Sequence, residues 1–92
     1  MLPIIWRESA LESLDIILGF IVAHNEYAAF RLQSEIEHST LNLAEYPYLG
    51  RAGRVPGTRE LVINANYVVV YEVALASIDI LDVLHTRQEY PY

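Results

Sequence analysis

The sequence contains no cysteine, which excludes disulfide bonds, thiolate metal sites and thiol nucleophiles. It contains no lysine either, because all six basic residues are arginines. A Walker-type phosphate loop, a Schiff-base lysine and a Ser-Lys dyad are therefore excluded. Every fixed positive charge is a planar guanidinium, which favours specific pairing with a carboxylate, a phosphate or an aromatic ring over diffuse attraction.

Long apolar runs are also missing. The most apolar stretch, Ile16 to Ala23, is far shorter than the roughly 20 residues that span a bilayer. The first residues lack the basic region, apolar stretch and small-residue cleavage site of an export signal. With the absence of cysteine, these features predict a soluble cytoplasmic protein with no membrane contact.

Positive charge is scarce and is concentrated in one place. The net charge of −6 opposes broad binding to nucleic acid. Against this acidic background, residues 50–61 (GRAGRVPGTREL) combine glycines with Arg51, Arg54 and Arg59 just before an apolar strand pattern. Such a contrast is typical of a contact surface, although Arg51 and Arg54 have the alternative of pairing with Glu45 or Glu60.

We expect one α+β domain covering residues 1–92, because a chain of 92 residues supports a single core. A strand is predicted at 2–6, and Ser9 with Glu12 has the capping-box spacing that starts a helix at Ala10 and ends it near Asn25. Asn25 is predicted to cap a second helix that runs to about Ala44 and forms a hairpin with the first.

A loop is predicted at 45–57, followed by strands at 58–63, 66–75 and 78–85. Their short connections predict an antiparallel meander, and the helical hairpin is expected to form one layer on one antiparallel sheet in the order βααβββ. In the last strand Ile78, Ile80 and Val83 alternate with Asp79 and Asp82, which predicts one dry sheet face. The apolar stripe of the first helix is wide enough to predict burial on two sides.

Several segments together resemble the RelE/ParE superfamily of bacterial type II toxin-antitoxin toxins, which includes plasmid stabilisation proteins. They are residues 57–62 (GTRELV), residues 66–71 (NYVVVY) and residues 80–91 (ILDVLHTRQEYP). The likeness also includes Trp6 at the end of the first strand, Ala28-Ala29 after Asn25, and Tyr46-Pro47 before Gly50-Arg51. It covers nearly the whole chain and implies the same βααβββ fold.

The resemblance implies two alternative activities. One branch of the superfamily cleaves messenger RNA on the ribosome, and in that branch Arg59, His85, Arg87 and Tyr90 would be the catalytic residues. The other branch binds a type II topoisomerase, usually DNA gyrase, and arrests growth without bond cleavage. This chain has Val68 where the ribonuclease branch carries a basic residue after the strand tyrosine, and Leu61 replaces a lysine. These departures favour the gyrase inhibitor over the mRNA interferase. A degenerate, non-toxic binding module is the third hypothesis.

The resemblance also implies partners. The candidate target-binding residues are Arg51, Arg54, Arg59 and Arg87. A cognate antitoxin is expected to cover the first helix, at Leu14, Ile17, Phe20 and Ile21. The chain is expected to assemble as a hetero-oligomer with that antitoxin or as a homodimer through the first helix, and to need no cofactor or metal. Tyr90-Pro91-Tyr92 is either a frayed tail or docks on the sheet beside Tyr67 and Tyr71.

Overall fold

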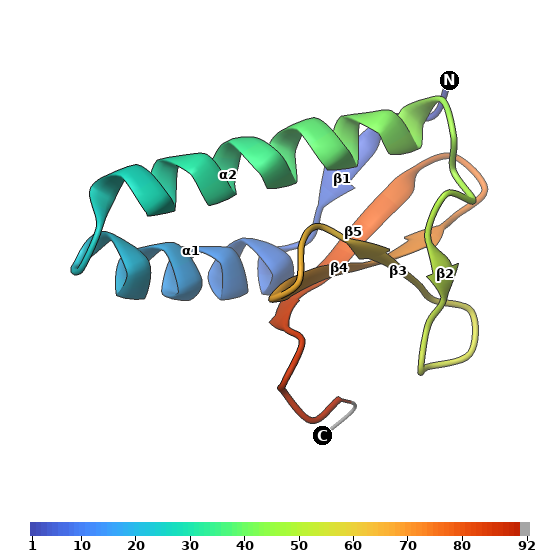
Figure 1. The fold of residues 1–92 in the computed structure, drawn as a ribbon. Helices are drawn as coiled ribbons and strands as arrows, with labels where there is room; N and C mark the ends of the chain where they lie inside the picture. The colour runs from blue at the N-terminus through green and yellow to red at the C-terminus, as the bar shows by residue number, and fades with distance from the viewer. Residues whose placement is uncertain (91–92) are drawn as a thin grey trace.

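The computed structural model describes residues 1–90 and shows two helices on one side of a five-stranded sheet (Figure 1). The elements follow in the order β1 (Ile4–Trp6), α1 (Glu8–Val22), α2 (Glu26–Leu41), the 3-10 turn η1 (Asn42–Ala44), β2 (Arg51–Ala52), β3 (Arg59–Val62), β4 (Tyr67–Val73) and β5 (Ile78–His85). The predicted α+β class and the βααβββ order of the main elements are confirmed. The second helix together with η1 reaches Ala44, as expected. Within the described range, no helix is long and apolar enough to cross a membrane.

The sheet is mixed, with strand order β1-β5-β4-β3-β2. The antiparallel meander predicted for β3, β4 and β5 is confirmed, but β1 pairs parallel to β5, with Ile4 opposite Ile78. The expectation of a wholly antiparallel sheet is therefore wrong. A parallel pair needs a long crossover between its strands, and the helical hairpin lies within that crossover. The two-residue edge strand β2 lies in the segment predicted to be loop.

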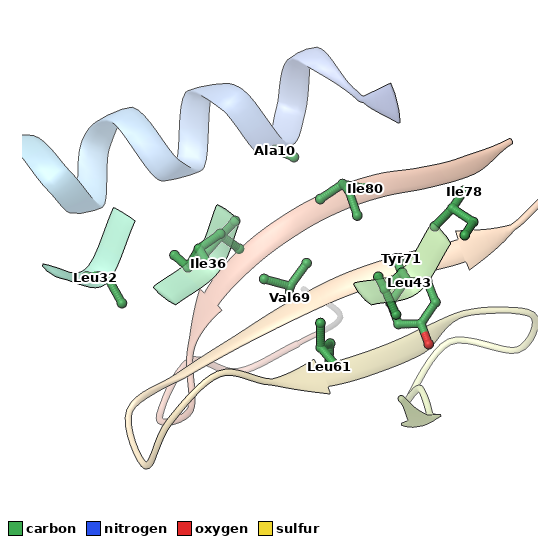
Figure 2. Packing of buried hydrophobic residues seen from close by; sticks show 10 residues of the cluster. Ala10, Leu32, Ile36, Leu43, Leu61, Val69, Tyr71, Ile78 and Ile80 are labelled. Carbon is green, nitrogen blue, oxygen red and sulfur yellow. The ribbon is translucent and has the colours of Figure 1, made fainter. Parts of the chain in front are cut away.

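The main core fills the space between the helices and the sheet (Figure 2). Its fully enclosed members come from every layer: Ile36 of α2, Leu43 of η1, Val69 and Tyr71 of β4, and Ile78 and Ile80 of β5. A register shift between Val70 and Tyr71 in the β4–β5 pairing leaves Leu81 outside the ladder. This irregularity lets Val83 join Ile78 and Ile80 in the main core, which confirms the predicted dry face despite the odd spacing.

The start of α1 differs from the prediction. The helix begins at Glu8 after Arg7, and no side chain caps it. Ser9 donates its hydroxyl to the carbonyl of Leu81 at 2.7 Å instead of serving as a cap. The physical reason is tertiary, since the backbone amide of Arg7 bonds Ile80 in β5 and fixes the turn into the helix two residues early. The second predicted cap is confirmed, because Asn25 Oδ1 accepts the amide of Ala28 at 3.0 Å.

The first helix is covered on one side only, so the expected burial on two sides is wrong. Ala10 is the only α1 residue that is fully buried. Leu14, Ile17 and Ile21 pack against the main core, whereas Phe20 is 73 % exposed. With only two layers in the described structure, nothing lies over the outer side of this helix (Figure 1).

Candidate functional site

The face of the sheet away from the helices carries a buried carboxylate. Glu60 in β3 pairs with Val70 in β4, so its side chain lies on the same face as Val70. A second apolar cluster covers that face, made of Val68, Val70 and Leu84 with Leu81 and Tyr90 packed against them. Glu60 itself is only 3 % exposed. Burial of an ionised carboxylate in such surroundings is costly unless positively charged groups pair with it.

Two arginines of the preceding loop supply those partners. Arg51 donates from Nη2 and Nε to Glu60 Oε1, at 2.9 and 3.2 Å. Arg54 Nε lies 3.4 Å from Glu60 Oε2, an oxygen that is buried and accepts no hydrogen bond within residues 1–90. The pairing of Arg51 and Arg54 with Glu60 is therefore the alternative that the structure supports. Both guanidinium groups keep part of their surface in solvent, with side-chain exposures of 58 % and 40 %.

Arg59 lies on the opposite face. It pairs with Tyr71 across β3 and β4, and Tyr71 belongs to the main core beneath the helices. Its guanidinium donates to the carbonyls of Gly50 at 3.0 Å and Tyr48 at 3.3 Å, and its Cζ lies 5.3 Å from the centroid of the Tyr48 ring. Arg59 thus fastens residues 48–50 to the edge of the sheet.

Tyr71 anchors the same loop from inside the core. Its hydroxyl accepts the amide of Gly50 and donates to the carbonyl of Pro47, both at 2.8 Å. A Cβ at Gly50 would lie 2.7 Å from the Glu60 carbonyl and 2.8 Å from the Tyr71 hydroxyl. Only glycine permits this approach, so the geometry of the loop depends on residue 50 having no side chain.

The C-terminal segment folds back over the second apolar cluster. Tyr90 packs there, with Arg54 Cζ 5.9 Å from its ring centroid and Arg54 Nη1 3.4 Å from its carbonyl oxygen. Burial, with the nearby carboxylates of Asp82 and Glu60, raises the pKa of Tyr90, so the phenol stays neutral at physiological pH. Tyr90 therefore docks on the sheet, but on the face opposite Tyr67 and Tyr71 and not beside them. Pro91 and Tyr92 lie outside the described residues.

The four residues expected to cut RNA are not brought together. Arg59 and His85 lie on the helix side of the sheet, where the His85 ring meets Tyr67 edge-on at 5.2 Å, whereas Tyr90 lies on the other side. His85 Nδ1 accepts the backbone amide of Arg87 at 3.1 Å, so one ring nitrogen is already used. Each acid or base must lie within hydrogen-bond reach of the atom with which it exchanges a proton, and a set divided between the two faces of the sheet does not converge on one scissile phosphate.

The structure also gives three residues roles that the sequence did not indicate. Glu60, expected only as an alternative ion-pair partner, is buried and organises both arginines, Tyr71 anchors the loop, and Asp79 is a buried ion-pair partner. Hydrogen bonds from Ser77 and from Arg7, the latter at 2.7 Å, hold the pKa of Asp79 below its ordinary value. One signal was available for Glu60, since a lone carboxylate inside an apolar strand run next to arginines indicates a buried pair. In the described part of the chain, no three His, Asp or Glu side chains are grouped as metal ligands would be.

Comparison with known proteins places this geometry in a family. Residues 4–90 match the model of the ParE toxin of type II toxin-antitoxin systems. The chain belongs to the ParE toxin family. The match extends from β1 through Tyr90. It therefore includes residues 50–61, the arginine loop, and the segment that covers the second apolar cluster.

Two relatives agree with that assignment. Y4kP of Sinorhizobium fredii, named as a candidate toxin, is 38 % identical over 94 % of this chain and 90 % of its own length. Toxin RelE2 of Caulobacter vibrioides is 33 % identical over 96 % of this chain and 99 % of its own. This chain is therefore a member of the RelE/ParE superfamily of toxins.

Two solved structures share the fold. A chain of the chromosomal ParDE toxin-antitoxin system from P. aeruginosa superposes with a TM-score of 0.81 and 24 % identity, over 92 % of this chain and 96 % of that one. Protein HP0894 from Helicobacter pylori superposes with a TM-score of 0.59 and 18 % identity, over 96 % of this chain and 98 % of its own. At these identities the likeness establishes the fold.

Proposed function

We propose that this protein is a growth-arresting toxin that acts by binding a type II topoisomerase, with DNA gyrase as the main candidate. A cognate antitoxin neutralises it. The observation that carries this proposal is the separation of Arg59 and His85 from Tyr90 by the thickness of the sheet. A gyrase inhibitor needs a shaped surface and anchoring side chains, whereas a ribonuclease needs a converged set of groups.

The charges on the face of the sheet away from the helices support the same proposal. Cleavage of RNA needs uncompensated positive charge beside the scissile phosphate. Here the guanidinium groups of Arg51 and Arg54 pair with the buried Glu60. At the position where the ribonuclease branch has a cation, Val68 is buried in the second apolar cluster. The face therefore offers an RNA backbone little free positive charge.

Among the four arginines proposed to bind the target, Arg87 is the best placed. Its side chain is exposed, and within residues 1–90 it makes no hydrogen bond or ion pair. Arg51 and Arg54 present part of their surface while they hold Glu60, so they remain proposed contacts with a structural role as well. Arg59 is half-buried against Tyr48 and serves mainly to hold the loop.

The antitoxin site on α1 needs a changed set of residues. Leu14, Ile17 and Ile21 are partly covered by the main core, so they offer a partner less surface than expected. Phe20 is the member of the expected set that faces solvent. The proposed antitoxin contact therefore lies further round the helix than the sequence indicated.

A supercoiling assay tests the proposed target. Purified chain should inhibit supercoiling of relaxed plasmid by gyrase in a dose-dependent way and leave ribosome-bound messages intact. Cleavage of messages in the ribosomal A site, with supercoiling untouched, would establish the ribonuclease alternative. The 33 % identity to Toxin RelE2 is a reason to test that alternative. Unimpaired division of cells that express the chain without antitoxin would instead support the non-toxic module.

A further inference from the structure

The segment between η1 and β2 exposes three large side chains close together. Figure 1 shows this segment at the end of the molecule away from the turn that joins α1 to α2. Tyr46, Tyr48 and Leu49 are 60 %, 68 % and 57 % exposed. We define these three side chains, with the Arg59 guanidinium that lies over the Tyr48 ring, as the tyrosine surface. Large apolar and aromatic side chains grouped in this way indicate an interaction site.

The backbone beneath the tyrosine surface is held in place by the rest of the fold. The amide of Tyr46 bonds the carbonyl of Asn42 at 2.9 Å, and the amide of Leu49 bonds the carbonyl of Tyr46 at 3.1 Å. Tyr71 and Arg59 hold the two carbonyls between these positions, from the core and from the sheet edge. A fixed backbone with outward side chains loses little conformational entropy when a partner binds. The loop is therefore preorganised for contact.

Two hollows flank this loop and give a partner's side chains a place to lie. One has a volume of about 400 Å³ and is lined by residues 45–49. The other has a volume of about 340 Å³ and lies between the loop and the start of the chain, where Met1 and Leu2 line it. Glu45 and Pro47 line both hollows, so the two are neighbours on one surface. A partner with two adjacent apolar side chains fits them.

The charges beside the hollows favour a protein over a nucleic acid. Arg59 bonds two carbonyls, yet neither Arg59 nor Glu45 forms an ion pair within residues 1–90. A phosphate backbone is disfavoured, because Glu45 lines both hollows and the net charge is −6. A second copy of the chain would bring the same net charge. A different protein can offer a carboxylate to Arg59 beside its apolar side chains.

The composition of the tyrosine surface indicates which kind of protein contact it makes. The other exposed apolar group is Ile16 and Phe20 of α1 with Phe30 of α2, which we term the outer hairpin surface, and these side chains have no polar atom. Tyrosine and arginine keep a polar end in water when the chain is free and dominate the binding energy of many protein contacts. Permanent interfaces are the more apolar class. The tyrosine surface therefore suits a partner that the free toxin meets, and not one that stays bound during storage.

We propose that the tyrosine surface is a contact through which the chain binds its topoisomerase target. Tyr46 and Leu49 pack against apolar residues of the topoisomerase, and Arg59 faces one of its carboxylates while still holding the loop. This inference rests on the proposed function. It adds a contact to the one proposed at Arg87, and the two are tested by separate variants.

The test uses the full chain and purified gyrase, with inhibition of supercoiling and calorimetric binding in the absence of DNA as readouts. Tyr46→Ala with Leu49→Ala should raise the concentration for half-inhibition at least about tenfold and weaken binding equally, as expected for central contact residues. The melting temperature should match that of the wild type, because both side chains are exposed. Tyr27→Ala is the matched control. It removes a 72 % exposed tyrosine from the start of α2 and should change inhibition less than about twofold.

The other outcomes separate the surface from the function. A wild-type chain that neither binds nor inhibits gyrase would overturn the proposed function and, with it, the target contact. Wild-type inhibition that the double variant retains in full would overturn the tyrosine surface alone. A double variant that inhibits gyrase but no longer binds the antitoxin would reassign the surface to the antitoxin.

Two further occupants have their own signatures. A wild-type dimer in sedimentation experiments that the double variant dissociates, with inhibition unchanged, would reassign the surface to a second copy. Binding to gyrase that requires DNA and that Glu45→Arg strengthens would reassign it to the nucleic acid, because the substitution replaces a carboxylate beside both hollows with a cation.

Discussion

The arginine loop and the outer hairpin surface differ in how fully the rest of the chain pairs or covers their side chains. Residues 50–61 hold half of the chain's arginines, and Arg51, Arg54 and Arg59 all bind groups of the same molecule. The outer hairpin surface has no unusual composition, yet residues 1–90 leave Ile16, Phe20 and Phe30 72 %, 73 % and 69 % exposed. A concentration of charge in a sequence can thus mark a structural device, and a partner site is better identified by side chains that the fold leaves uncovered.

The largest effect should come from removing both arginines that hold Glu60. The double variant Arg51→Ala/Arg54→Ala leaves a buried carboxylate without a partner, which lowers the free energy of unfolding by about 3–5 kcal/mol. Urea denaturation measures this change. Addition of Glu60→Leu should restore much of the loss, because an apolar side chain suits the second apolar cluster.

A stable double variant would reverse the assignment of Arg51 and Arg54 as structural residues. If the double variant is as stable as the wild type but no longer inhibits its target, the two arginines are contact residues first and structural residues second. Arg31→Ala is the matched control, since it breaks an exposed i,i+4 pair with Glu35 that contributes about 0.3–0.5 kcal/mol.

The next effect concerns the other anchor of the loop. Tyr71→Phe removes the hydroxyl that bonds Gly50 and Pro47 and leaves the Gly50 amide without its acceptor. The expected destabilisation is about 1–3 kcal/mol, the cost of an unsatisfied buried donor. Hydrogen exchange should show faster exchange at residues 47–52 with little change in the helices. Uniform loss of protection across the whole chain would indicate that Tyr71 supports the core and not the loop in particular.

The sequence predicted the helices and the β3–β5 meander because their signals are local. Asn25 caps its own helix, and the apolar alternation of β5 indicates one face without any knowledge of its neighbours. The predictions that proved wrong share a different cause, which is contact between residues that are far apart in the sequence. Ser9 bonds Leu81 and Arg7 bonds Asp79, both across most of the chain, so neither the true start of α1 nor the burial of Asp79 was visible locally.

The candidate site was less predictable than the fold for the same reason. The sequence identified Arg51, Arg54 and Arg59, and it offered Glu60 as an alternative partner for the first two. Strand alternation alone places Arg59 and Glu60, which are adjacent in the chain, on opposite faces of the sheet. The sequence did not indicate which of the two faces lies beneath the helices, because that depends on the register with β4, a tertiary fact.

A smaller effect, which acid should remove, is expected at the ion pair between Arg7 and Asp79 at the start of the hairpin. The pKa of Asp79 lies below its ordinary value of 3.8, first because Ser77 and then because Arg7 donates to the carboxylate. A depressed pKa contributes stability that is fully present above the ordinary value and is lost as the pH falls through the depressed value. Wild type should therefore exceed Asp79→Asn in stability at pH 6, and the gap should narrow below about pH 4. Thermal denaturation across pH checks this, and a gap independent of pH would exclude the ion-pair explanation.

The smallest effect on stability, and the sharpest on function, is expected at Arg87. Its exposed side chain makes no ion pair within residues 1–90, so Arg87→Ala should change the free energy of unfolding by less than about 0.5 kcal/mol. If Arg87 contacts the topoisomerase, the same variant should need several-fold more protein to inhibit supercoiling while it binds the antitoxin at the outer hairpin surface with unchanged affinity. Unaltered inhibition would remove Arg87 from the target contact, and would direct attention to the exposed parts of Arg51 and Arg54, which hold Glu60 with one side of the guanidinium and face solvent with the other.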